Sequence, residues 1–174
     1  MTANEEPDIC IIQEDSEDMV IRELNTDGTE LLKDFIYEAI FVPEGEDPPD
    51  RSIIYKPEIS MYYERFGSRP GDLCMVADDG GKVVGAVWTR LMHDYGYVDD
   101  ETPSLAISLY REYRGRGIGT EMMRRMLELL KQQGYGKVSL SCQKANKAVC
   151  LYRRLGFRVH EDKDDEFIMV HGLE

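Results

Sequence analysis

The chain has 174 residues, of which 42% are hydrophobic and 32% are charged. This composition is typical of one folded domain with a substantial core. A membrane-spanning helix needs about 20 apolar residues, and no apolar run in the chain approaches this length. Residues 1–6 are polar and acidic, unlike a secretory signal. We therefore expect a cytoplasmic protein that does not contact a membrane.

The net charge of −13 is unevenly distributed. Residues 111–158 carry 12 basic and 3 acidic residues, whereas the rest of the chain is acidic. A basic segment in an acidic protein favours a local site for a phosphorylated ligand over a broad nucleic-acid interface, although exposed helix faces also carry such residues. The four cysteines and three histidines fit no zinc spacing or disulfide framework, so we expect reduced thiols and no metal site.

The pattern along the chain predicts an acidic lead-in over residues 1–18, with a short strand at 9–12, and a single domain over residues 19–174. The expected elements are a strand at 20–24, a helix at 30–41 capped by Thr29, a loop at 43–51, a helix at 57–66, a hairpin of strands 73–77 and 83–91, an acidic connector at 94–103, a strand at 104–110, a helix at 118–133, a strand at 138–142, a helix at 146–155, and strands at 157–160 and 167–171.

The most informative segment is the turn Arg-Gly-Arg-Gly-Ile-Gly at residues 114–119, between the strand at 104–110 and the helix at 118–133. Such a turn directs free backbone N–H groups and the positive end of the helix dipole to one point, which favours a phosphate. The P-loop pattern is absent, because no Gly-Lys pair follows. The dinucleotide fingerprint also fails, since its third glycine would follow Gly117 by three residues. A tight turn without a ligand is the remaining alternative.

A second motif, Asn-Lys-Ala-Val-Cys-Leu-Tyr-Arg-Arg-Leu-Gly-Phe, covers residues 146–157. Together the two motifs resemble the acyl-coenzyme A signatures of the GCN5-related N-acetyltransferase (GNAT) family, Arg-x-x-Gly-x-Gly and Asn-x5-Tyr-x3-Gly-Phe. The resemblance implies a GNAT-type α/β (α+β) fold. Its central sheet is mixed and mostly antiparallel, with about seven strands flanked by about four helices. The sheet is splayed between the fourth and fifth strands.

The resemblance also implies that acetyl-CoA is the co-substrate, with no metal. The turn would hold the pyrophosphate through its backbone N–H groups, and glycine lets the backbone approach the phosphates. The strand before the turn would pair with the pantetheine arm, and Asn146 would cap its helix and bond that arm. The cofactor-binding residues implied are Ile107, Ser108, Leu109, Arg114, Gly115, Arg116, Gly117, Ile118, Gly119, Thr120 and Asn146.

Two catalytic residues follow from the resemblance. Tyr152 occupies the position of the family's general acid, where a phenol can hydrogen-bond the sulfur of the leaving thiolate or protonate it. Packing on a buried helix stripe is its structural alternative. Glu101, just before the strand at 104–110, is the candidate base, with Asp99 and Asp100 beside it. A solvated acidic loop explains these three carboxylates equally well.

The acceptor is expected to be a small primary amine. Residues 37–66 and 94–101 combine acids with tyrosines, which suits a cationic amine through charge and cation–π contacts. A soluble acidic surface over a tyrosine-rich core is the structural alternative. Two other functions stay open: a non-catalytic acyl-CoA-binding regulatory module, and a protein N-terminal or lysine acetyltransferase. A homodimer is compatible with the family, and no nucleic-acid partner is expected.

Overall fold

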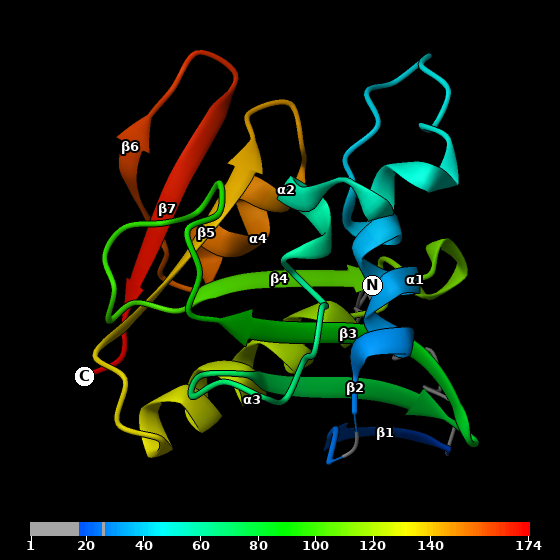
Figure 1. The fold of residues 1–174 in the computed structure, drawn as a ribbon, viewed down its shortest axis with the longest axis horizontal. Helices are drawn as coiled ribbons and strands as arrows, with labels where there is room; N and C mark the ends of the chain where they lie inside the picture. The colour runs from blue at the N-terminus through cyan, green and yellow to red at the C-terminus, as the bar shows by residue number, and fades with distance from the viewer. Residues whose placement is uncertain (1–17, 26) are drawn as a thin grey trace, which may run out of the picture.

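The computed structural model describes residues 18–25 and 27–174, which contain one seven-stranded sheet (Figure 1). Its strands are β1 (Met19–Glu23), β2 (Leu73–Asp79), β3 (Lys82–Arg90), β4 (Ser104–Leu109), β5 (Lys137–Gln143), β6 (Arg158–Asp162) and β7 (Glu166–Gly172). The spatial order is β1-β2-β3-β4-β5-β7-β6. The β4–β5 pair is parallel and the other neighbours are antiparallel, so the predicted mixed, mostly antiparallel sheet is confirmed.

The four predicted α-helices are all present in the described part of the chain. They are α1 (Thr29–Ala39), α2 (Pro57–Ser60), α3 (Ile118–Gln132) and α4 (Ala148–Arg154), with two short 3-10 helices at Arg51–Tyr55 and Arg111–Tyr113. The proposed strand at residues 9–12 and almost all of the lead-in at 1–18 lie outside the described residues.

Two local predictions about helix ends are wrong. Thr29 does not cap α1: its hydroxyl accepts a hydrogen bond from the Phe66 N–H, while the Asp27 carboxylate accepts one from the Thr29 N–H at 2.9 Å. The helix expected at 57–66 ends at Ser60. Its continuation forms turns because the Arg90 guanidinium takes the Met61 and Glu64 carbonyls, at 2.9 and 2.8 Å, as hydrogen-bond acceptors.

The core lies in two layers, one on each face of the sheet. On β2, Met75 and Ala77 face the layer that contains α3 and α4, whereas Cys74 and Val76 face the layer beneath α1. This alternation follows from the two-residue period of a strand. Helix α3 buries six side chains, namely Ile118, Met122, Met123, Met126, Leu129 and Leu130. At about 1.5–3 kcal/mol for each fully buried side chain of this kind, they fix α3 against the sheet.

The sheet divides between β4 and β5. The two strands pair at one position, Ser104 with Ser139, where the Ser139 N–H donates to the Pro103 carbonyl at 3.0 Å. Beyond that point they separate, which confirms the predicted splay; we call the resulting opening the split. Gly96 of the connector packs against β5 there, and a Cβ on Gly96 would lie 3.2 Å from backbone atoms of Leu140 and Ser141. This close approach therefore favours glycine.

Candidate active site

One wall of the split is the backbone of β4. The Tyr110 N–H donates to the Val84 carbonyl at 2.9 Å, and Ser108 lies opposite Ala86 in the same antiparallel ladder. Since backbone groups alternate in direction along a strand, those of Ile107 and Leu109 face the split and those of Ser108 face β3.

Ser108 has a different task from the one expected. Its buried hydroxyl donates to the Phe35 carbonyl at 2.7 Å and so fastens α1 to β4. The Leu109 carbonyl already accepts a hydrogen bond from Arg114 Nε at 2.9 Å. Of the three strand residues, Ile107 is therefore the one whose backbone groups face the split without such a side-chain contact.

The glycine-rich turn forms the start of α3, as its sequence predicted. Gly115 and Gly117 have φ values of +74° and +81°, in the left-handed region that favours glycine. The Glu121 N–H donates to the Gly117 carbonyl at 3.2 Å, which is the first hydrogen bond of the helix. The N–H groups of residues 118–120 precede it and have no acceptor within the helix. They point out of its positive end, so this turn has the geometry of an anion site.

The two arginines of the turn have different roles. Arg114 is engaged within the fold, because besides its bond to Leu109 it lies 3.6 Å from the Glu38 carboxylate of α1. Arg116 forms no ion pair with a described residue, and its guanidinium lies 5.3 Å from the centre of the Tyr113 ring. It is exposed, so Arg116 is the cation of the turn that is available to a ligand.

Helix α4 brings the second motif to the β5 side of the split. Asn146 Oδ1 accepts a hydrogen bond from the Ala148 N–H at 2.9 Å, so Asn146 supports the start of α4 as expected. Tyr152 is 8% exposed and its ring centre lies 5.9 Å from that of Phe157. Burial, and then the nearby Cys142, raise the pKa of the Tyr152 phenol. Its hydroxyl makes no hydrogen bond with a described residue, so it is a neutral donor available to a ligand.

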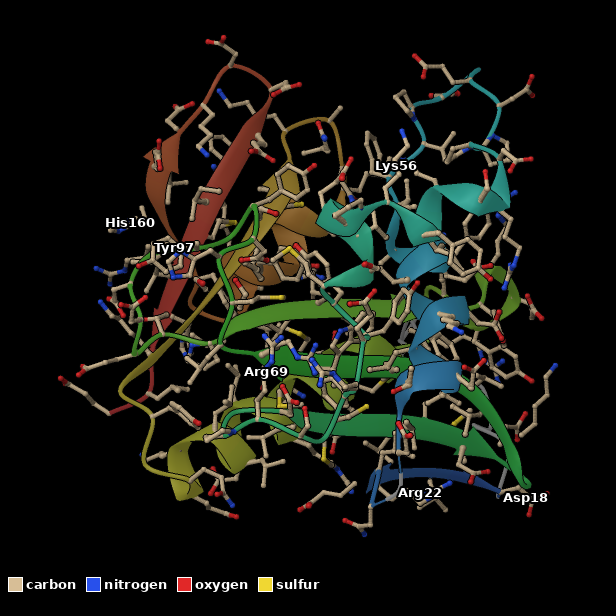
Figure 2. The ribbon with its side chains drawn as sticks, viewed as in Figure 1. Asp18, Arg22, Lys56, Arg69, Tyr97 and His160 are labelled. Carbon is tan, nitrogen blue, oxygen red and sulfur yellow. The ribbon has the colours of Figure 1, made fainter. Side chains whose placement is uncertain are left out.

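The predicted base Glu101 is an exposed residue of the connector before β4. Its backbone N–H donates to Asp99, and its carboxylate makes no hydrogen bond or ion pair with Tyr152 or any other described residue. The neighbouring acids serve the connector itself. Hydrogen bonds from Lys137 and Thr102 lower the pKa of Asp99 to about 2. Asp100 accepts hydrogen bonds from the Tyr97 hydroxyl and the His93 ring (Tyr97 is labelled in Figure 2).

A different acid of the connector, Asp94, lies at the closed end of the split. Its two oxygens accept hydrogen bonds from the hydroxyls of Ser104 and Tyr62, each at 2.6 Å. In the sequence, Asp94 stands out only as one of several acids. The one signal for its position was the polar Ser104 at the first, buried place of a predicted strand. Tyr62, more than 30 residues earlier, could not be connected with it from sequence.

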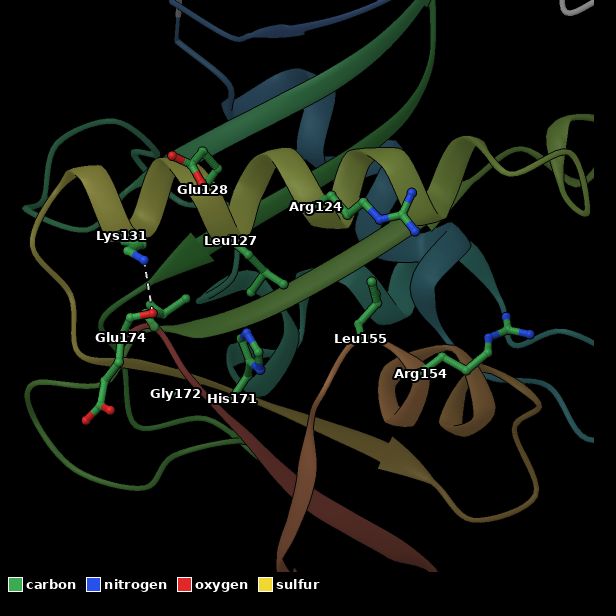
Figure 3. Close-up of a pocket in the computed structure, with 10 residues that line it drawn as sticks. Arg124, Leu127, Glu128, Lys131, Arg154, Leu155, His171, Gly172 and Glu174 are labelled. Carbon is green, nitrogen blue, oxygen red and sulfur yellow. Dashed lines mark hydrogen bonds between the residues drawn. The ribbon is translucent and has the colours of Figure 1, made fainter.

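The molecule also has a shallow hollow of about 420 Å³ between α3, α4 and the end of β7 (Figure 3). Its lining is mixed in charge, with Arg124, Lys131 and Arg154 beside Glu128 and Glu174, and Lys131 Nζ donates to the Glu174 carbonyl at 3.0 Å. None of its lining residues belongs to β4 or to the glycine-rich turn. The hollow therefore lies beside the split and not within it.

Among the described residues, no group of three or more His, Cys, Asp or Glu side chains is placed to hold a metal ion. No helix in the same part of the chain is long and apolar enough to cross a membrane.

Comparison with known protein families identifies the family to which this chain belongs. A model described as the acetyltransferase (GNAT) family matches residues 34–157, which include β4, the glycine-rich turn and α4. The chain belongs to the GNAT family. The resemblance seen in the two motifs is thereby confirmed.

Individual GNAT relatives match part of the chain. It is 36% identical over 84 residues to the probable N-acetyltransferase camello of Xenopus tropicalis, covering 48% of this chain and 37% of that protein. It is 34% identical over 91 residues to the N-alpha-acetyltransferase MAK3 of Arabidopsis thaliana, covering 49% and 44%. The match thus spans less than half the length of either relative.

Solved structures extend the likeness to nearly the whole fold. A GNAT-family acetyltransferase from Streptococcus pneumoniae superposes with a TM-score of 0.66 at 19% identity, over 90% of this chain and 99% of that one. The PaiA N-acetyltransferase of Thermoplasma acidophilum, solved in complex with coenzyme A, gives a TM-score of 0.65 at 20% identity, over 88% and 98%. At these identities the likeness shows the GNAT fold.

Proposed function

We propose that this protein transfers an acetyl group from acetyl-CoA to a primary amine by direct attack in a ternary complex. The observation that carries the proposal is the split itself. An anion site at the start of α3 lies at its open end, and a phenol without a partner among the described residues is on α4. Family membership and the coenzyme A complex of the PaiA structure support the same ligand.

Each part of acetyl-CoA has a matching group in the site. The pyrophosphate binds the N–H groups of residues 118–120, with Gly115 and Gly117 allowing close approach and Arg116 adding a positive charge. The pantetheine arm runs along β4, where the backbone of Ile107 faces it. Leu109 and Arg114 shape the turn, Ser108 holds α1 against β4, and Asn146 supports the start of α4 with its oxygen and donates to the arm with its amide nitrogen.

The reaction begins when the neutral amine attacks the thioester carbonyl carbon. A C–N bond forms, the C–S bond breaks and its electron pair goes to sulfur. The thiol of coenzyme A, which is the conjugate acid of the leaving thiolate, has a pKa of about 8.5 by analogy with cysteine. This pKa is lower than that of a buried phenol. Tyr152 therefore acts by donating a hydrogen bond to the developing thiolate, and solvent supplies the proton in the end. Glu101 stays the predicted acceptor of the amine proton.

Thiol release from acetyl-CoA, followed with a thiol-reactive dye, tests the proposal. Cadaverine, tyramine and pentylamine are the probe amines, and calorimetry measures acetyl-CoA binding separately. We expect amine-dependent thiol release above the amine-free rate. Tight acetyl-CoA binding without turnover of any amine would instead establish the non-catalytic binding module.

A protein acceptor is the second candidate, because one relative is named an N-alpha-acetyltransferase and the acidic surface suits a basic peptide. A short peptide with a free N-terminus, assayed beside the amines, separates the two. A kcat/KM for the peptide above those of all three amines would favour the protein substrate. Cytoplasmic location and a homodimer stay predictions.

A further inference from the structure

The connector and the segment after α2 meet at Asp94. One carboxylate oxygen accepts a hydrogen bond from the Ser104 hydroxyl and the other from the Tyr62 hydroxyl, both at 2.6 Å. Ser104 is the β4 residue that pairs with β5, so Asp94 lies where the two strands begin to separate. Tyr62 and Ser104 are 7% and 2% exposed, whereas Asp94 is half-buried and reaches solvent.

Both supports of Asp94 are rigid. On the Tyr62 side, Arg90 donates to the carbonyls of Met61 and Glu64, which flank Tyr62 in the chain. Arg90 also forms a fully buried ion pair with Asp72 at 2.8 Å. On the connector side, the buried Ser139 hydroxyl donates to the Gly96 carbonyl at 2.7 Å. The carboxylate of Asp94 is thus held in a fixed orientation before any substrate arrives.

The charge of Asp94 is not neutralised by the described part of the protein. Its two partners are hydroxyls, and no described cation forms an ion pair with it. By contrast, Asp99 pairs with Lys137 at 2.8 Å and Asp78 pairs with Arg22 at 3.0 Å. A carboxylate has about four lone-pair positions, so two hydrogen bonds leave room for further donors. An ammonium group offers three donors and the missing charge.

The charge of Asp94 also acts on Tyr62. Burial, followed by the charge of Asp94 and the hydrogen bond to it, raises the pKa of the Tyr62 phenol far above its usual range. The closed end of the split therefore carries the negative charge of Asp94, whereas the glycine-rich turn at the other end of β4 is positive.

We propose that Asp94 binds the reacting ammonium group of the acceptor and thereby selects cationic amines. This assignment rests on the proposed acetyl transfer. Because the pyrophosphate site follows the C-terminal end of β4, the thioester extends along β4 towards Ser104 and places its carbonyl beside Asp94. A carboxylate attached next to the reacting nitrogen would approach Asp94, so simple amines are preferred to α-amino acids.

The Asp94→Asn variant tests the assignment in the full chain, because asparagine keeps the shape and hydrogen-bonding capacity but loses the charge. We expect the KM for pentylamine and tyramine to rise about 10- to 100-fold, as loss of a hydrogen bond to a charged group does. The KM for acetyl-CoA stays within twofold. Asp100→Asn is the matched control, since it removes the same charge from the same connector and leaves both KM values unchanged.

Two further comparisons separate binding from a structural role. Tyr62→Phe keeps the carboxylate and removes one support, so its amine KM rises less than that of Asp94→Asn. In the unmodified protein, pentanol and pentylamine are compared as competitors of tyramine. We expect the Ki of the neutral pentanol to be at least tenfold above the Ki of pentylamine. Tyrosine and norleucine, which add an α-carboxylate to tyramine and pentylamine, have at least tenfold lower kcat/KM.

If the wild-type protein is active and Asp94→Asn has an unchanged amine KM, the assignment of Asp94 is wrong and the proposed function stands. Equal effects of Asp94→Asn and Tyr62→Phe on stability, without an effect on amine KM, also overturn the assignment by showing a structural role. Equal Ki values for pentanol and pentylamine would also overturn the assignment, and this comparison needs no variant. If no amine is turned over at all, the proposed function itself fails and the assignment fails with it.

Discussion

Gly117→Ala is the sharpest test of the anion site, because strain and ligand binding can be separated. Gly117 has φ +81°, and a Cβ there would meet no atom within 4 Å. The substitution therefore causes no clash and costs only the left-handed backbone, about 1–2 kcal/mol. The reduced freedom of the unfolded chain offsets about 0.4–1 kcal/mol of that. We expect a net loss of about 1 kcal/mol and a Tm lower by about 2–4 °C.

The same helix provides the control. Gly134, just after α3, has φ +88°, and a Cβ added there would also meet no atom within 4 Å. Gly134→Ala should lose the same stability and keep its affinity for coenzyme A. In Gly117→Ala the methyl group stands where the pyrophosphate approaches, and loss of one charge-assisted hydrogen bond lowers affinity about tenfold or more. Calorimetry with coenzyme A measures both variants, and equal affinities would refute the anion site.

Three other predictions concern catalysis, stability and pH. Tyr152→Phe should lower kcat about 100-fold with the KM for acetyl-CoA within threefold, because only the transition state carries charge on sulfur; steady-state kinetics with an unchanged kcat would contradict the role. Arg90→Met should cost about 3–5 kcal/mol in urea unfolding, since it leaves the buried Asp72 carboxylate unpaired; a loss below 1 kcal/mol would contradict this. The pKa of Asp99 is lowered to about 2, so the stability that it contributes is complete above its unfolded value of 3.8 and lost as pH falls towards 2. Thermal unfolding of Asp99→Asn should therefore differ from the wild type at pH 6 and converge with it near pH 2.

The elements that the sequence predicted well are those encoded locally. The hairpin around residues 78–81 has its own turn signal, and α3 has a repeated apolar stripe that follows two glycines. The turn at 114–119 was interpretable because glycine spacing and helix position together restrict the backbone. In each case neighbours in sequence are also neighbours in space.

The features that sequence reasoning missed depend on contacts between distant segments. Helix α2 stops early because Arg90 takes carbonyls from residues more than 25 positions away. Ser108 turns from the split because of its register with β3, which a strand pattern alone does not contain. Asp94 gains its position from Tyr62 and Ser104, and no spacing in the chain joins these three.

The single pairing of Ser104 with Ser139 gives this sheet an edge in its middle as well as at its sides. An open strand edge normally invites another chain, and outer edges are protected by charge, shortness or irregularity. The inner edge of β4 lies inside the split, between two strands of the same sheet. In the proposed function, a slender, flexible cofactor arm covers this edge and pairs with the β4 backbone as a further, non-peptide strand.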